Sequence, residues 1–270
     1  MFEKLTYINH LNEEIVFGEG NILVSRNDIR DYEWGYETRY NKVLGFKRGI
    51  SQKSLPVLVF GENKTAIANR MFEVIEKDLL AGKAGKLYVG DYYLSGYFNA
   101  SRKKDYNDKY YLKTTLKFVT TQYHWIHEST FIFREGGGGS TSGLLDYPHP
   151  YPFDYVSNTD IKNFTNTGFV PSDFIIRIYG SVTNPSVIIN GDVHRVYCEL
   201  RGNEYLDINS MDKTIIRTTG SGAKVNEFAN RDTQSYIFEK IPTGDCSVVI
   251  NPTCNVDITL LEERSEPAWI

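Results

Sequence analysis

The sequence has little of what marks several large classes of protein. It holds no run of about 18 apolar residues, so we expect no membrane-spanning helix. Its first residues, MFEKLTYINH, lack the basic and apolar regions of a secretory signal peptide. The formal net charge of −4 gives no sign of the basic face that nucleic-acid-binding proteins carry. Three methionines and few alanine-rich runs in 270 residues argue against a helical bundle.

Metal-binding patterns are also missing. Cys198, Cys246 and Cys254 are odd in number and show no CxxC spacing, whereas structural zinc sites need paired ligands at short intervals. We therefore expect reduced, buried cysteines. His124 and His127 lie three residues apart, and on a strand such residues point to opposite faces, so they cannot hold one ion together. No metal and no cofactor is expected.

No catalytic pattern is complete. Gly220–Lys224 (GSGAK) lacks the spacing of a phosphate-binding loop and is expected to be a turn between strands. Gly139–Gly143 is a near-miss of the serine hydrolase motif, without a helix behind it. His194 is close to Cys198 in sequence, but nothing nearby would activate the thiol. We expect that the protein is not an enzyme.

What is abundant is aromatic and β-branched sequence, with 19 tyrosines and 15 phenylalanines. Such residues favour strands, and the first half is predicted to consist mostly of short strands. One helix is expected after residue 60, capped by Thr65 and ended by Gly82. Its buried stripe would consist of Ile67, Met71, Val74, Ile75 and Leu79.

The second half is predicted to be almost purely β. About eight short strands are separated by turn residues, and Asn190-Gly191 is the strongest hairpin signal among them. Regular short strands of this kind indicate an antiparallel β-sandwich. The predicted fold class is therefore mainly β: an N-terminal β domain with one helix, followed by a C-terminal antiparallel sandwich.

A joint separates the two halves. Residues 135–155, EGGGGSTSGLLDYPHPYPFDY, begin with flexible glycines and end in a stiffer Tyr/Pro/Asp run. Although Gly136–Ser140 also spells a common engineered linker, its uninterrupted continuation favours natural sequence. We expect a domain at 1–135, a connection at 136–170 and a domain at 171–270. Candidate residues for docking between the domains are Tyr147, Tyr151, Phe153 and Tyr155.

Residues 32–40 carry large side chains at every second position, which predicts a strand with one aromatic face. If that face meets solvent, it is a candidate partner surface; the alternative is that it belongs to the core. The candidate residues for such an interface are Tyr32, Trp34, Tyr36 and Tyr40.

The order of these parts resembles the distal tail proteins of siphophages and of related tail-like particles. Six phrases carry the resemblance: FEKLTYINHLNEEIVF, DYEWGYETRY, TAIANRMFEVIEKDLLAGKAGKLYV, YPHPYPFDY, IIRIYGSVTNPSVIINGDV and IPTGDCSVVI. The resemblance implies that the N-terminal domain assembles as a hexameric ring and that the C-terminal sandwich is galectin-like. It does not imply sugar binding, because the galectin His-x-Asn-x-Arg pattern and Trp platform have no match here.

The implied function is a structural hub of a phage tail, built in the host bacterial cytoplasm and located in the virion tail. Its implied partners are further copies of itself, the tail tube protein, the tail tip protein and a receptor-binding protein. DNA would pass through the ring without specific binding, and a net acidic chain is compatible with that. The alternative is a non-catalytic carbohydrate-binding sandwich, with the joint tyrosines as candidates.

Overall fold

A computed structural model describes residues 4–105, 109–134 and 162–269 of the chain. Contacts divide the chain into two compact units, which are described separately. Unit 1 comprises Met1–His127 and Glu263–Ile270, and unit 2 comprises Glu128–Glu262. The C-terminal residues thus belong to the N-terminal unit, which the expected division did not foresee. The joint at 135–155, with Tyr147, Tyr151, Phe153 and Tyr155, lies outside the described residues.

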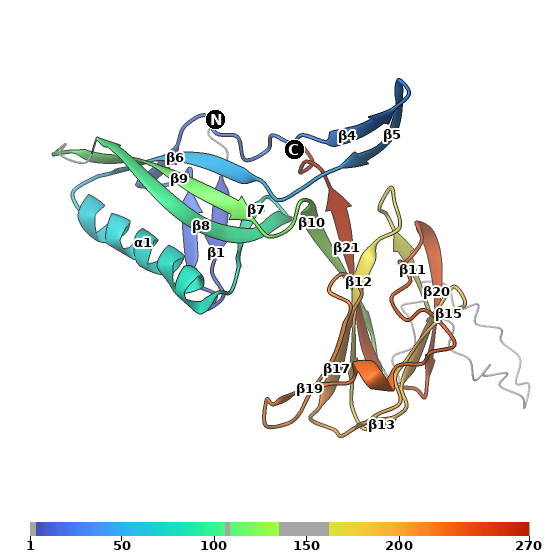
Figure 1. The fold of residues 1–270 in the computed structure, drawn as a ribbon. Coiled ribbons are helices and arrows are strands. Elements are labelled where there is room, and N and C mark those ends of the chain that lie inside the picture. Colours follow the sequence, from blue (N-terminus) through green and yellow to red (C-terminus); the bar gives the residue numbers. More distant parts are fainter. Residues whose placement is uncertain (1–3, 106–108, 135–161, 270) are drawn as a thin grey trace, which may run out of the picture. The chain divides into compact units, whose positions relative to one another are not determined.

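Unit 1 consists of antiparallel strands and one helix (Figure 1). Its elements are β1 (Leu5–Ile8), β2 (Glu14–Phe17), β3 (Ile22–Val24), β4 (Gly35–Arg39), β5 (Lys42–Lys47), β6 (Gln52–Phe60), α1 (Lys64–Ala81), β7 (Gly85–Val89), β8 (Tyr92–Asp105), β9 (Tyr111–Thr120) and the start of β10 (Trp125–Phe133). Hydrogen-bonded neighbours follow the order β3-β6-β9-β8-β7-β1-β2. The amide of Gly18 donates to the carbonyl of Ile22 (2.7 Å), which links the two ends of this order.

Helix α1 packs on the sheet of unit 1 through a stripe of buried residues (Figure 1). The predicted end is confirmed, because Gly82 adopts a left-handed conformation (φ 62°) and its amide caps the last turn. The start was predicted wrongly: Asn63 precedes the helix without a side-chain cap, and Thr65 lies inside it. Leu79 is 41% exposed, and the position expected of it in the stripe is taken by Asp78.

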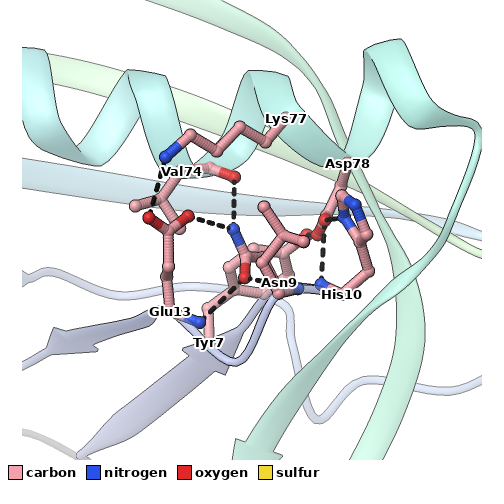
Figure 2. Close-up of polar contacts among 8 residues, drawn as sticks. Tyr7, Asn9, His10, Glu13, Val74, Lys77 and Asp78 are labelled. Carbon is pink, nitrogen blue, oxygen red and sulfur yellow. Dashed lines mark hydrogen bonds and ion pairs between the residues drawn. The ribbon is translucent and has the colours of Figure 1, made fainter.

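The fully buried carboxylate of Asp78 joins the helix to the loop between β1 and β2 (Figure 2). The Tyr7 hydroxyl donates to its Oδ2 (2.5 Å), and the His10 amide (2.9 Å) and Nδ1 (2.5 Å) contact its Oδ1. Burial, followed by the hydrogen bond to this carboxylate, raises the pKa of Tyr7 well above its ordinary value. Gly85 is required beside this group, because a Cβ there would lie 2.4 Å from the Tyr7 hydroxyl.

Asn9 makes a second connection between the same loop and helix (Figure 2). Its amide nitrogen donates to the Val74 carbonyl (3.3 Å) and to Glu13 Oε2 (2.7 Å). Its amide oxygen accepts from the backbone amide of Glu13 (2.8 Å). Lys77 completes the group with an ion pair to Glu13 (2.7 Å). The loop therefore contacts α1 at Val74 and Lys77 as well as at Asp78.

Unit 2 is a two-sheet antiparallel structure around one apolar core (Figure 1). Its further elements are β11 (Lys162–Asn166), β12 (Asp173–Tyr179), β13 (Val182–Thr183), β14 (Ser186–Ile189), β15 (Asp192–Arg195), β16 (Glu199–Leu200), β17 (Tyr205–Asn209), β18 (Thr214–Thr218), β19 (Lys224–Asn226), the short helix η1 (Phe228–Asn230), β20 (Gly244–Asn251) and β21 (Asn255–Arg264). One sheet runs β19-β18-β17-β12-β21-β10 and the other β11-β20-β14-β15. The predicted sandwich-rich β class is confirmed.

Several local predictions for unit 2 are confirmed as well. Asn190 and Gly191 both have positive φ (50° and 99°) in the hairpin between β14 and β15. Residues 220–223 lie in the turn that leads from β18 into β19, which begins at Lys224. Cys246 and Cys254 are buried thiols, but Cys198 is only half-buried. Burial raises the pKa of the Cys198 thiol to about 11.

Two segments differ from expectation. The polar residues 102–108 would be expected to form a hairpin loop, but β8 continues to Asp105, with register shifts at Phe98/Ala100 and Lys103/Asp105. The expected connection at 136–170 includes β11 near its end, where Phe164 is buried in the core of unit 2. In the first case β8 pairs with the next strand, β9, and in the second β11 pairs with the distant β20; local sequence reveals neither pairing.

We predict that Asp78→Ala lowers the free energy of unfolding of unit 1 by about 3 kcal/mol. The substitution leaves the Tyr7 hydroxyl and the His10 amide without their buried acceptor. Tryptophan fluorescence during urea unfolding reports this selectively, because Trp34, Trp125 and Trp269 all belong to unit 1. Glu76→Ala, at an exposed position of α1, is the matched control. An equal effect of the two substitutions would contradict the role of Asp78.

We also predict that unit 2 loses stability as pH falls below about 6.5 because of His194. This side chain is 1% exposed, and burial lowers its pKa, so the unfolded chain takes up a proton that the folded unit resists. The contribution of His194 to the stability of unit 2 is fully present above its pKa in the unfolded chain. It is lost as pH falls through the lower pKa of His194 in the folded unit. The slope is at most about 1.4 kcal/mol per pH unit for one proton.

Calorimetric unfolding between about pH 5 and 7 measures this slope. His194→Gln retains a donor for the Ile237 carbonyl, which Nδ1 contacts at 2.7 Å, but does not titrate, so its curve is expected to be flatter. His124→Gln, in unit 1, is expected to keep the parental slope for unit 2. Identical slopes for the parent and His194→Gln would show that other groups cause the acid sensitivity.

Candidate assembly surface

Strands β4 and β5 form a hairpin that is exposed along almost its whole length (Figure 1). The two strands pair with each other and with no other strand in the described parts of the chain. Every residue of both strands is exposed except Gly45, which is half-buried. Tyr40 and Asn41 form a two-residue turn with positive φ at both positions (49° and 59°), as type I′ hairpins require.

This hairpin carries large apolar side chains that no core covers. Tyr36 (67% exposed) lies directly opposite Phe46 (65%) across the strand pair. The turn residue Tyr40 is 86% exposed, more than any other described aromatic side chain. Val43 and Leu44 are also more than half exposed. Contiguous exposed apolar surface of this kind marks interaction sites in soluble proteins.

A bulge in β5 brings Leu44 to the surface. Glu37 pairs with Gly45 and Thr38 with Val43, so Leu44 has no partner in the opposite strand. An extra residue of this kind bends a strand and redirects its side chains. The bulge therefore gives the hairpin one more exposed apolar side chain than two regularly paired strands would have.

The charges of the hairpin are mostly positive. It carries Arg39, Lys42 and Lys47 against the single acid Glu37, which is in contact with the Lys47 ammonium group. The Arg39 guanidinium lies over the Tyr40 ring at 5.2 Å. A surface that binds the hairpin must therefore combine apolar area with net negative charge.

An open pocket of about 600 Å³ lies at the base of the hairpin. Lys53, which is 7% exposed, lines it and donates to the carbonyl of Asp31. Arg48 lies over the Tyr32 ring at 5.5 Å. Desolvation by burial lowers the pKa of both Lys53 and Arg48, so these cations are held in a partly dehydrated setting.

The C-terminal residues fasten this base within unit 1. Ser265 accepts from Trp34 Nε1 through its hydroxyl (3.2 Å) and from Arg48 through its carbonyl (3.3 Å). Arg30 donates to the Pro267 carbonyl (3.0 Å), and its guanidinium lies 4.3 Å from the centre of the Trp269 ring. Sequence reasoning missed these contacts, because Trp34 and Ser265 are 231 positions apart and no local pattern connects them.

The structure places all four predicted interface residues at or beside the hairpin. Tyr32 (51% exposed) and Trp34 (37%) precede β4, Tyr36 lies in it, and Tyr40 lies in the turn. The alternative that this aromatic face is core is wrong. The predicted strand from residue 32 to 40 is too long, because the turn residues end β4 at Arg39. Val43, Leu44 and Phe46 were missed, although their apolar character on a short strand was a usable signal.

The remaining candidates do not gather into a second centre. His124 contacts the Trp34 ring at 5.7 Å between ring centres, whereas His127 contacts Tyr92 at 5.1 Å. Among the described residues, no group of three His, Cys, Asp or Glu side chains is arranged to hold a metal ion. In the same part of the chain, no helix combines the length and apolar character needed to cross a membrane.

Comparison with solved structures decides the fold. The Dit protein of phage SPP1, described as a hub of the adsorption apparatus in phages that infect Gram-positive hosts, matches with a TM-score of 0.57 and 13% identity. That match covers 96% of this chain and 99% of the SPP1 chain. The chain has the Dit-like phage tail hub fold.

Two structures of the phage p2 baseplate in its activated conformation, one with Ca and one with Sr, agree with this assignment. Each matches this chain with a TM-score of 0.65 and 12% identity, over 99% of this chain and 100% of the baseplate chain. No protein-family model and no curated protein matches the sequence. The structural matches thus cover both units of this protein.

We predict that removing residues 265–270 loosens the base of the hairpin. The truncation deletes the acceptors that Ser265 and Pro267 provide to Trp34, Arg48 and Arg30. Amide hydrogen exchange in residues 28–34 and 47–53 is expected to become at least about tenfold faster. Peptides from β7 in the same sample are the control, because this strand pairs with β1 and β8. Unchanged exchange at the base would show that the hairpin is held by other contacts.

Proposed function

We propose that the chain is a structural, non-enzymatic distal tail protein of a phage or phage-tail-like particle, located in the virion tail. The observation that carries this proposal is the coextensive fold match to the SPP1 Dit protein, whose description is a hub of an adsorption apparatus. The match includes both units, so it supports a role for the whole chain. In this role the chain joins the tail tube to the tail tip or baseplate.

Six copies of the chain would close into a ring through unit 1. Ring closure needs two different, complementary surfaces on each copy. The β4–β5 hairpin supplies one of them, with Tyr36, Tyr40 and Phe46 as its apolar centre. Its complement on the next copy must be apolar and net acidic, because the hairpin carries three cations and one acid. Tyr32 and Trp34 then lie at the edge of the interface, beside the pocket at the hairpin base.

The ring would connect to the tail tube protein, the tail tip protein and a receptor-binding protein. It would also let DNA pass. A basic channel would hold the phosphate backbone by releasing condensed counterions, whereas an acidic chain of formal charge −4 avoids this. In the same proposal, unit 2 points outward from the ring and has the galectin-like topology that the resemblance implies.

Negative-stain microscopy with light scattering tests the ring directly. Purified chain at high concentration is expected to form rings of six copies, and gold-labelled chain is expected at the end of the tail tube in assembled particles. Particles that assemble normally but carry no label at that end would overturn the proposal. If the purified chain is monomeric in solution but labels the end of the tail tube, the ring would form only on the tail.

We predict that Tyr40→Asn combined with Phe46→Ser abolishes ring assembly and leaves unit 1 folded. Asn tolerates the left-handed conformation of residue 40, so the turn is retained while both rings are removed. Ile132→Ser is the matched control, since Ile132 is 62% exposed on unit 2 and Phe46 is 65% exposed. Rings formed equally well by the double variant would exclude the hairpin as the interface.

A further inference from the structure

Unit 2 has an open pocket of about 460 Å³ that the proposed ring does not use. It lies between the turn after β17, which contains Lys213, and the segment from Phe228 to Phe238 that starts with the short helix η1. Its volume falls within the range of about 300–1,000 Å³ that small-molecule sites occupy. Its lining residues all come from positions 213–238, so none of them belongs to the hairpin base in unit 1.

Three aromatic rings form the apolar part of this pocket. Phe238 is 3% exposed and forms the floor. The Phe228 ring lies nearly parallel to it, with centres 6.1 Å apart and planes at 19°. The Tyr236 ring lies at the same distance from Phe238 but at 75°. Tyr236 is 59% exposed, so its ring face and hydroxyl are accessible to a ligand.

Two cations lie over these rings. The Lys213 ammonium group is 5.6 Å from the centre of the Tyr236 ring and 5.4 Å from that of Phe238. The Arg231 guanidinium lies 4.1 Å from the centre of the Phe228 ring, and its Nη1 donates to the Phe228 carbonyl (2.8 Å). Each cation still has donors left for an incoming acceptor.

Asp232 is the one acid among the described residues that line the pocket, and its carboxylate is already engaged. It is 5% exposed, accepts from the Gln234 amide (2.9 Å) and lies 3.6 Å from Arg195. The accessible charge of the pocket is therefore positive, which favours an anionic ligand.

The wall of the pocket is held in place before any ligand arrives. Ser235 Oγ donates to the Val193 carbonyl (2.8 Å), and His194 Nδ1 contacts the Ile237 carbonyl (2.7 Å). The Asp232 amide donates to the Arg195 carbonyl (3.0 Å). Three bonds to strand β15 thus fix the segment that carries Tyr236 and Phe238, so binding would not require it to be ordered.

We propose that this pocket binds a sugar that bears a phosphate or carboxylate group. The exposed face of Tyr236, which the buried Phe238 supports from below, suits the C–H surface of a pyranose ring. Lys213 and Arg231 suit its anionic group. A flat nucleobase fits less well, because a ring inserted between two others needs about 7 Å, whereas Phe228 and Phe238 are 6.1 Å apart. The inference does not depend on ring assembly.

Isothermal titration of the full chain with four probes tests this proposal. Glucose 1-phosphate and glucuronate are expected to bind at least about tenfold more tightly than glucose or inorganic phosphate, since only they engage both rings and cations. Their affinities are expected to fall as salt is raised. Failure of both anionic sugars to bind at about 10 mM would overturn the proposal. Tighter binding of adenosine monophosphate than of either sugar would also overturn it, in favour of a nucleotide.

Substitutions locate the site. Lys213→Asn retains the turn, because residue 213 has φ 55° and Asn tolerates that conformation, and is expected to weaken glucose 1-phosphate at least about tenfold. Tyr236→Ala is expected to weaken glucuronate and glucose 1-phosphate alike. Lys224→Gln, at an exposed position on β19, is the charge-matched control and is expected to bind like the parent. Binding that survives both pocket substitutions would place the ligand elsewhere.

Discussion

The docking of the helix in unit 1 depends on one buried charge. Asp78 occupies a position on α1 where the helical period calls for an apolar residue, and it is fully buried. A carboxylate is stable there only if its oxygens are bonded, and Tyr7 and His10 provide those bonds. The contacts of His10 with Asp78 thereby tie the loop between β1 and β2 to the helix.

The hairpin in the same unit shows the opposite constraint, because apolar side chains are held in solvent. A strand pair on its own is marginally stable in water, so its base must be supported by the rest of the fold. Arg48 and Trp34 give that support through Ser265, which returns from the far end of the chain. The bulky Tyr40 in a left-handed conformation adds local strain that its own core contacts do not offset. Tyr40 therefore gains nothing from packing within its own unit, since its side chain is 86% exposed.

Sequence alone predicted the class of the fold and the features with a local cause. Gly82 and Asn190-Gly191 were identified correctly, because a positive φ limits which residues fit. Leu79 was placed in the core wrongly, because the helical period cannot tell that Tyr7 would satisfy a buried Asp78. The four candidate interface residues were chosen from their alternation, and their role in assembly stays a prediction. The contacts of the C-terminal residues depend on a return of the chain that no local pattern encodes.

The pocket of unit 2 was beyond sequence reasoning for a related reason. Lys213 comes from a turn and Phe238 from a segment 25 positions later (238 − 213), and only the packing of that segment on β15 brings them together. The Trp platform and the His-x-Asn-x-Arg strand of galectins, which this chain lacks, are not needed to pair a ring face with a cation. Assembly surface and pocket lie on different units, so loss of one leaves the other intact.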